Sequence, residues 1–374
     1  MASVAQARGA GCHRALLLSS GIMSKMLEEI RQQPAALERA LKSELARIGR
    51  LKARLEASRP RFIVLTARGT SDNAALFGRY LLPITTGIPV ALAAPSIFTL
   101  YRAKVDLRDA LVVAVSQSGE STDTNLILEQ AREQGAITVG ITNEAGSSLD
   151  KLAEYTFLVR AGKERSVAAT KTYTGQLMTF YLIAYALGAR LGPDDLRRLP
   201  DWVEKALRLE PEIAAASERY RFMERAVVVG RGLNYANAFE FSLKLMETCY
   251  IVAERFSAAD FLHGPIAMVE RSFPMFAFAP PGVTWPSMRD FLGKLQRLKA
   301  ETLVITDKTN CAAIKGGRTI CLPMKLTVSG AAPEEVYTPI PYIIPAQLFA
   351  ASLAAWKGLN PDQPRTITKV TQTL

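Results

Sequence analysis

Short apolar runs alternate with helix-length segments along most of the chain. In the first half these runs are residues 62–67, 90–94, 111–115 and 137–141, all beyond Pro60. Such alternation is typical of parallel strands connected by helices that cover the faces of the sheet. The pattern therefore predicts an α/β fold, with a boundary between two halves in the Pro- and Asp-containing residues 192–200.

The residues before this alternating region have a different period. From Met23 to Ser58, apolar residues recur at three- and four-residue steps among many charged ones. This period predicts one long amphipathic helix with a break near Pro34, and the basic residues 47–54 are expected to be its solvated face. Residues 1–21 hold an apolar stretch too short for a signal peptide. We expect a disordered tail there, with Met23 as an alternative start.

The second half repeats the first at a nearly constant offset. Three features recur 163 or 164 residues later, each after an apolar run: Arg68-Gly69 with Arg231-Gly232, Gly119 with Gly282, and Ile141-Thr142 with Ile305-Thr306. Three matches in register predict two copies of one α/β domain. We expect a helical lead-in over residues 22–58, a first domain over 59–195 and a second domain over 196–374.

A hydroxyl-rich turn follows the apolar run 111–115 and precedes a helical pattern. It contains Ser116, Gln117, Ser118, Gly119 and Ser121. Parallel sheets bind ligands at the carboxyl ends of their strands, where hydroxyls and the N–H groups of the next helix can hold a phosphate. Glycine lets the backbone approach the ligand closely. The alternative is that the serines only cap the helix. The turn matches neither GxxxxGK[ST] nor GxGxxG.

Two other segments can approach the same ligand. Thr70 and Ser71 follow the preceding apolar run in the equivalent place, although a simple capped turn would have the same residues. Val167 and Ala168 belong to a small-residue segment before an apolar helix, where close packing is the alternative explanation. In the second copy, residues 279–282 read Ala-Pro-Pro-Gly, which removes the hydroxyls and two backbone donors. Only the first copy is therefore expected to hold an anion.

Candidate reacting groups lie in the second half. Lys244 and Glu247 are three residues apart, so a helix places them on one face, as it would an ordinary surface ion pair. His263 begins a His-Gly-Pro turn and is one of two histidines in the chain, and Lys369 lies near the C-terminus. A carboxylate suits proton transfer and a histidine suits acid–base chemistry near neutral pH. A lone histidine is more often structural.

These segments together resemble the sugar isomerase (SIS) domain family, and within it the isomerase half of glutamine:fructose-6-phosphate amidotransferase. The resemblance covers about residues 45–374, and its motifs are residues 68–71, 116–121, 167–171, 244–247, 263–265 and 362–365, the last followed by Lys369. It implies two tandem SIS domains, each a flavodoxin-like three-layer sandwich with a parallel sheet between helices. Family members need no metal or organic cofactor.

The resemblance also implies roles for individual residues. Ser71, Ser116, Gln117, Ser118 and Ser121 would bind the sugar phosphate, and Glu247 would move a proton between carbons 1 and 2. His263 would open the sugar ring in the site of a neighbouring subunit, which implies a homodimer. Lys369 would line the closed site, and Lys244 would set the charge state of the carboxylate.

The activity expected from this resemblance is an amino-sugar phosphate deaminase that converts glucosamine 6-phosphate to fructose 6-phosphate and ammonium. The sequence holds no recognisable glutaminase domain and has Ala169 where the family often has serine. Four alternatives remain: a galactosamine-6-phosphate deaminase, a fructosamine-6-phosphate deglycase, a partner-dependent aminotransferase (isomerising) subunit, and a sugar-phosphate sensor without catalysis.

Composition adds three expectations. The net charge of +11 can attract a phosphate dianion as well as nucleic acid, and we expect no nucleic-acid partner. No apolar run approaches the roughly 18 residues of a spanning helix, so no membrane association is expected. The four cysteines form no CxxC pair, which argues against a disulfide framework and a metal site and favours a reducing cytoplasm.

Overall fold

Two five-stranded parallel sheets and the helices around them make up the protein, which we describe from a computed structural model. The structure describes residues 24–367, so the expected tail and Lys369 lie outside it. The strands are β1 Phe62–Thr66, β2 Val90–Leu92, β3 Ala110–Val115, β4 Ile137–Thr142, β5 Tyr155–Leu158, β6 Arg225–Gly230, β7 Val252–Ser257, β8 Pro274–Phe278, β9 Glu301–Asp307 and β10 Arg318–Leu322.

Most of the described helices connect these strands or lie before them. The α-helices are α2 Lys25–Arg31, α3 Gln33–Leu45, α4 Ile48–Ala57, α5 Thr70–Thr86, α6 Pro95–Thr99, α7 Thr122–Glu133, α8 Ser148–Leu152, α9 Lys171–Ala186, α10 Pro193–Arg197, α11 Leu199–Leu207, α12 Glu210–Glu218, α13 Tyr235–Cys249, α14 Ala258–Leu262, α15 Trp285–Arg297, α16 Lys308–Cys311 and α17 Pro339–Trp356. Three short 3-10 helices are η1 Gly232–Asn234, η2 Pro265–Met268 and η3 Glu334–Tyr337.

The two sheets have the same topology. The first has the order β2-β1-β3-β4-β5, and the second, read from its other edge, has β7-β6-β8-β9-β10. All neighbouring strands are parallel. This is the flavodoxin-like order, in which the chain turns back between its first and third strands. The internal repeat predicted from the sequence is thereby confirmed as two copies of one sheet topology.

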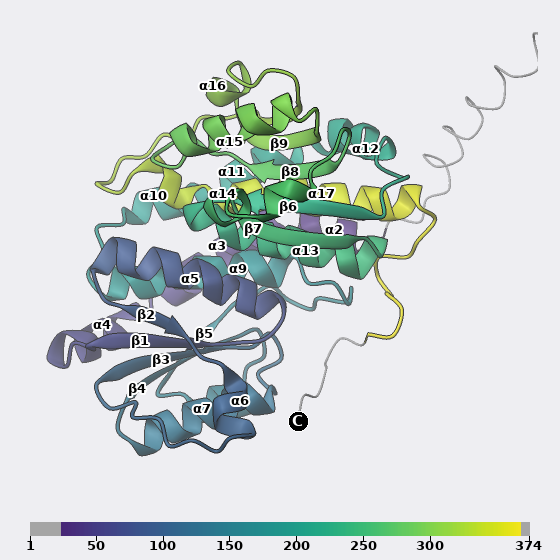
Figure 1. The fold of residues 1–374 in the computed structure, drawn as a ribbon. Coiled ribbons are helices and arrows are strands. Elements are labelled where there is room, and N and C mark those ends of the chain that lie inside the picture. The colour runs from purple at the N-terminus through teal and green to yellow at the C-terminus, as the bar shows by residue number, and fades with distance from the viewer. Residues whose placement is uncertain (1–23, 368–374) are drawn as a thin grey trace, which may run out of the picture.

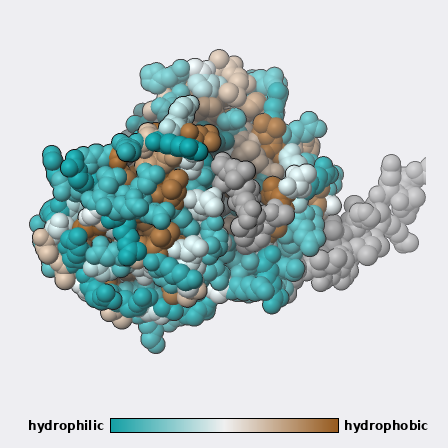
Figure 2. Space-filling view, turned by 90° about the horizontal axis from the view of Figure 1, so that it is seen from below, coloured by the Kyte–Doolittle hydropathy of each residue, from teal (hydrophilic) through white to brown (hydrophobic). Residues whose placement is uncertain are grey.

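A shared helical layer joins the two sheets. In Figure 1 the first sheet (blue) lies below and the second (green) above, with α5, α9 and α13 between them. Helix α5 packs against α9 and α13, and α13 packs against α17. One continuous core includes residues of both sheets, such as Ile63 and Ile305. On the face seen in Figure 2, hydrophilic residues predominate and hydrophobic ones form separate patches.

The lead-in is helical and broken near Pro34, as predicted, but it has a second break that was not predicted. It forms three helices, α2, α3 and α4, with breaks at Gln32, two residues before Pro34, and at Ala46-Arg47. The second break itself contains neither Pro nor Gly, although Gly49 follows two residues later. It lets Leu37 and Leu41 of α3 and Leu51 and Leu55 of α4 all reach the core.

The expectation about apolar runs was wrong for one helix. Among residues 24–367, α17 is long and apolar enough to cross a membrane by length and composition, and 83% of that window is buried inside the protein. Pro341 and Pro345 lie within it. Helix α17 packs against α11, α12 and α13, so its apolar character is that of a core helix.

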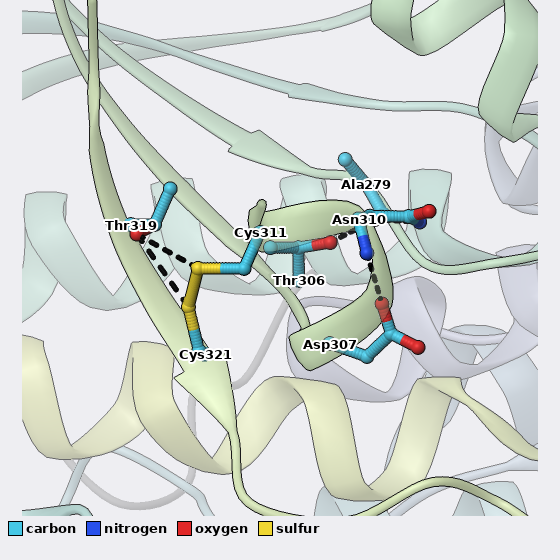
Figure 3. Close-up of a disulfide and its surroundings, with 7 residues drawn as sticks. All are labelled: Ala279, Thr306, Asp307, Asn310, Cys311, Thr319 and Cys321. Carbon is cyan, nitrogen blue, oxygen red and sulfur yellow. Dashed lines mark hydrogen bonds between the residues drawn. A yellow bond between two sulfur atoms is a disulfide. The ribbon is translucent and has the colours of Figure 1, made fainter. Parts of the chain in front are cut away.

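The argument against disulfides was also wrong. Cys311 and Cys321 are bonded, with Cα atoms 6.2 Å apart. Figure 3 shows the bond beside Thr319, with Asp307 and Asn310 of the neighbouring cap. Cys311 ends α16, directly after β9, and Cys321 lies on β10, which pairs with β9. The pairing of β9 with β10 brings the two cysteines together, although they are ten residues apart in sequence. The absence of a CxxC motif therefore says nothing about this disulfide. The cysteines therefore give no argument for a reducing compartment.

Candidate active site

The hydroxyl-rich turn lies at the carboxyl end of β3, next to the carboxyl end of β1. The two strands pair in register from Phe62 with Ala110 to Thr66 with Ala114. Open sheets of this order bind ligands at the point between these two strands. The turns after β1 and β3 are linked by an ion pair, Arg68 Nη2 to Asp123 Oδ2 at 2.6 Å. The structure thus brings the segments with Thr70 and with Ser116 to one edge of the first sheet.

Hydrogen bonds within the turn fix its shape. Ser116 Oγ accepts from the Gly119 N–H at 3.1 Å, and Ser118 Oγ accepts from the Glu120 N–H at 3.3 Å. Gly119 has φ +70°, and a Cβ there would overlap the Ser147 hydroxyl. The Gln117 carbonyl accepts from the Asn143 N–H at 3.1 Å. The turn is therefore held tightly and requires glycine at position 119.

Ser121 tests the alternative that the serines only cap the helix. It is the N-cap residue of α7, but its side chain makes no capping hydrogen bond. Ser71 is buried at the start of α5, where its hydroxyl accepts from Gln176 Nε2 at 2.9 Å. The Ser121 hydroxyl thus lies at the N-terminus of α7 without capping it, at the edge where an anion is expected.

A charged cluster on α13 joins the two halves. Lys244 is fully buried and lies between two carboxylates of its own helix, 2.6 Å from Glu247 Oε2 and 3.4 Å from Glu240 Oε1. Its ammonium also donates to Thr70 Oγ1 at 3.2 Å. Asn73 Nδ2 donates to Glu240 at 2.7 Å. The predicted residues Thr70, Lys244 and Glu247 therefore meet, and α5 of the first half lies against α13 of the second.

The three groups of the cluster differ in exposure and charge. Burial raises the pKa of Glu240 to about 7, against the opposing effects of Lys244 and Asn73. Burial lowers the pKa of Lys244, but the charges of Glu240 and Glu247 outweigh it and raise that pKa above its usual value. Of the three side chains, only that of Glu247 is accessible to solvent, with 22% of it exposed. The cluster thus presents one accessible carboxylate backed by a buried cation.

Val167 and Ala168 lie in a segment held from two ends of the chain. Glu29 of α2 accepts from the N–H groups of Arg165 and Ser166, and the Asp362 carbonyl accepts from the Val167 N–H at 3.2 Å. Ala168 is buried. The Asp362 carboxylate also accepts from the first N–H groups of α2, at 2.8 Å each. The segment's backbone is fixed mainly by residues far from it in sequence.

His263 does not join this cluster. It is exposed and ends α14, and its backbone N–H donates to the Asp260 carbonyl at 3.1 Å. Within residues 24–367 no hydrogen bond or ion pair connects its ring to Glu247. Lys369 lies outside the described residues, so its predicted place in the site has no structural counterpart here.

Sequence reasoning missed Glu240 and Asn73. Glu240, Lys244 and Glu247 stand at positions i, i+4 and i+7 of one helical face, a spacing that could have revealed the first carboxylate. Asn73 offers no such pattern, because its partner lies 167 residues away.

Neither a metal site nor the main surface hollow coincides with this cluster in the described residues. Among residues 24–367, no group of three or more His, Cys, Asp or Glu side chains could hold a metal ion. A surface hollow of about 790 Å³ is lined by Phe98, Arg102 and Arg108, among others. It includes residues that precede β3, so it lies at the amino end of that strand and not at the edge with the serine turn.

Comparison with known proteins agrees with this geometry. The SIS domain family matches residues 58–186 and 221–356. A glutamine–fructose-6-phosphate aminotransferase (isomerizing) of Pyrococcus horikoshii is 35% identical over 354 residues, which are 92% of this chain and 57% of that protein. That of Aquifex aeolicus is 33% identical over 93% of this chain and 58% of its own length. The chain thus spans less than two thirds of these relatives.

Solved structures show the same fold. The C-terminal domain of glucosamine-fructose-6-phosphate aminotransferase from Francisella tularensis superposes with a TM-score of 0.82 at 28% identity, over 92% of this chain and 99% of that one. Glucosamine-6-phosphate deaminase from Thermotoga maritima has a TM-score of 0.72 at 19% identity, over 94% of this chain and all of that one, which shows the fold alone. With two matched domains and two sheets of one topology, this chain belongs to the SIS domain family, as a tandem SIS protein homologous to the isomerase part of glutamine–fructose-6-phosphate aminotransferase.

Proposed function

We propose that the chain isomerises a hexose 6-phosphate at carbons 1 and 2 and gains or loses ammonia at carbon 2. The observation that supports this most is the Glu240–Lys244–Glu247 cluster, which meets Thr70 beside the phosphate-binding edge of the first sheet. A fixed phosphate places the remote end of the sugar, so that its binding energy orients the reacting carbons. The accessible carboxylate can then act on them.

In this proposal each part of the site has one task. The turn 116–121 and Ser71 hold the phosphate. Glu247 takes the proton from one of the two carbons and returns it to the other, and Lys244, 2.6 Å away, holds that carboxylate in place by an ion pair. Glu240, with its pKa raised to about 7, balances the buried ammonium without competing for the substrate. Val167 and Ala168 line the sugar, and Lys369 closes over it.

The comparisons favour synthesis over the deamination expected from the sequence. Relatives at 33–35% identity are aminotransferases, whereas the likeness to the deaminase is at 19% identity. We therefore favour fructose 6-phosphate and ammonia as substrates and glucosamine 6-phosphate and water as products, with ammonia supplied by a glutaminase. The same proton transfer serves the reverse reaction, so deamination remains the second candidate.

A proton-exchange experiment tests the isomerase step without any ammonia source. We would incubate the protein with fructose 6-phosphate in D₂O and follow deuterium at carbon 1 by NMR, alongside a Glu247→Gln variant. Exchange with the wild type and its loss in the variant would support the proposal. Absence of exchange, with fructose 6-phosphate and also with glucosamine 6-phosphate, would contradict it.

The direction is then settled by product formation. Glucosamine 6-phosphate formed from fructose 6-phosphate with ammonium, or with glutamine and a separate glutaminase, would support synthesis. Ammonium released from glucosamine 6-phosphate, with no measurable synthesis, would support the deaminase instead. Galactosamine 6-phosphate and fructosamine 6-phosphate in parallel separate the remaining alternatives.

We also propose a homodimer in which His263 acts as acid and base in the partner's site. Its exposure and its separation from Glu247 within one chain support this arrangement. Mixing and reassociating His263→Ala with Glu247→Gln tests it, because a mixed dimer would contain one complete site. Recovery of activity on mixing is expected. Two inactive variants that stay inactive after verified subunit exchange would contradict it.

A further inference from the structure

The second sheet has a position equivalent to the ligand-binding edge of the first sheet, between the carboxyl ends of β6 and β8. In the second sheet a side chain of the protein itself fills this position. The turns there follow β6 and β8 and contain Gly232 and Gly282. The Glu335 side chain lies between them: a Cβ on Gly282 would overlap Glu335 Oε2, and one on Gly232 would lie 3.9 Å from Oε1. Glu335 is 4% exposed. A buried carboxyl group therefore occupies the place where the first sheet offers an anion site.

The groups that hold this carboxyl correspond to those of the first sheet. Thr284 Oγ1 donates to Glu335 Oε1 at 2.5 Å, and the Thr284 N–H donates to Oε2 at 3.4 Å. Thr284 is the N-cap residue of α15, as Ser121 is of α7, and it stands 163 residues after Ser121. The same offset relates Gly282 to Gly119. The equivalent hydroxyl, helix start and glycine thus recur around an internal acid.

The backbone that carries Glu335 is fixed by hydrogen bonds, which keep its carboxyl group in this position. Glu335 lies in η3, directly before the core helix α17, and the Thr338 hydroxyl donates to its carbonyl at 2.7 Å. Asn234, from the turn after β6, donates to that same hydroxyl at 2.8 Å. The carboxyl group is therefore anchored by its own backbone and needs no mobile loop. The absence of hydroxyls in residues 279–282 does not prevent an anion site, because Thr284 and the helix start supply the donors.

We propose that Glu335 is a built-in ligand of the second domain's anion site, so that the chain binds one sugar phosphate and not two. Removal of its side chain opens a site for a small oxyanion of the phosphate class, bound by Thr284 and the start of α15. This inference does not depend on the reaction proposed above.

Phosphate-dependent stability tests it directly. Melting temperatures of the wild type, Glu335→Ala and a matched control, Glu334→Ala, would be measured in inorganic phosphate and in chloride at equal ionic strength. Glu334 is the adjacent acid of η3, and in the described part of the chain both hydrogen bonds from Thr284 go to Glu335. We expect Glu335→Ala to melt lower in chloride and to regain about 2 °C in phosphate at ten times its dissociation constant.

Two further variants and one titration complete the test. Glu335→Gln should show no extra phosphate response, because the amide still fills the space. Thr284→Val combined with Glu335→Ala should abolish the response. In calorimetry, fructose 6-phosphate should bind the wild type once per chain. If Glu335→Ala does not fold in chloride, its refolding yield with added phosphate replaces the melting curve.

Several results would overturn the inference. These are an equal phosphate response in Glu334→Ala and Glu335→Ala, no response of Glu335→Ala in melting or refolding, or two sugar-phosphate equivalents in the wild type. A wild type that binds no fructose 6-phosphate while Glu335→Ala still responds to phosphate would count against the proposed function only.

Discussion

Ser121 and Thr284 hold equivalent positions in the two domains but face different partners. The Ser121 side chain makes no capping bond and lies at an edge open to a phosphate, whereas Thr284 holds the buried Glu335. In the function we propose, the first domain binds the phosphate, whereas in the second domain the carboxyl group of Glu335 takes the place of such a ligand. The second domain would instead contribute α13, with Glu247 as the reacting carboxylate. Under this proposal one copy of the duplicated domain binds and the other reacts.

The largest effect that this division predicts is on turnover. Glu247→Gln should lower kcat by about 10²- to 10⁴-fold, because the amide cannot move the proton, and should leave sugar-phosphate affinity nearly unchanged. Steady-state kinetics and calorimetry measure the two quantities. Glu254→Gln, at an exposed position of β7, is the matched control and should change neither. Loss of affinity with unchanged kcat would place the carboxylate among the binding groups.

The second effect is on the stability of the interface between the two domains. Lys244→Met should lower the free energy of unfolding by about 3–5 kcal/mol, because it leaves two carboxylates without their buried cation. Adding Glu240→Gln should recover part of that loss. Chemical denaturation measures both. Lys294→Met, at an exposed position of α15, should stay within about 0.5 kcal/mol of the wild type. An equal effect of the two lysine changes would contradict the buried cluster.

The third effect should be confined to the second domain. Reduction of Cys311–Cys321, or the Cys311→Ser/Cys321→Ser double change, should cost about 2–3 kcal/mol of stability, as expected for a loop of ten residues. Binding of fructose 6-phosphate at the first sheet should not change. Denaturation with and without reductant, and calorimetry on the same samples, measure this. Weaker binding after reduction would show that the domains are coupled through this bond.

The fourth effect separates Ser121 from Thr284. Ser121→Ala should weaken sugar-phosphate binding by about 5- to 30-fold, since one hydrogen bond to a charged group is lost. Thr284→Ala should lower stability by about 1–2 kcal/mol without changing that affinity, because its partner is internal. Calorimetry measures the affinity and denaturation the stability of both variants, and each variant is the control for the other. An exchange of the two outcomes would reverse the assignment of the sites.

The smallest effect is a pH slope. Burial raises the pKa of Glu240 to about 7 from an unfolded value near 4.5. A carboxyl group with a raised pKa contributes stability below pH 4.5 that is lost as the pH rises through 7. The wild type should therefore lose stability relative to Glu240→Gln between pH 5 and 8. Denaturation at four pH values measures the difference, and a constant difference would show that Glu240 stays ionised.

Much of the fold follows from local pattern, and its exceptions have a physical cause. Strands β1, β3, β4, β6 and β8 are continuous apolar runs because helices cover both faces. Strand β7 escaped prediction because it is an edge strand with Glu254 and Arg255 in it. Helix α17 escaped because its prolines suggest a break, although burial keeps it helical. Tertiary packing decided both cases.

In the candidate site, sequence spacing was enough to predict a contact when both residues lie on the same helix. Lys244 and Glu247 are three residues apart on α13, so their pairing could be predicted. The contacts from Lys244 to Thr70 and from Thr284 to Glu335 cross 174 and 51 residues. No local pattern encodes such contacts, and only the packed structure shows that the second anion site is filled. The roles assigned to His263 and Lys369 stay predictions.

The contact between α2 and Asp362 has a topological consequence. The first N–H groups of α2 bind the Asp362 carboxylate at 2.8 Å, so residues 25 and 362 are neighbours in space. A short peptide could join the two ends there, and new ends could be opened near the exposed Arg190, between the halves. In such a circular permutant the ribosome would make the second domain first. Chain order is then a matter of synthesis, and the contacts across α13 and α5 hold the domains together in either order.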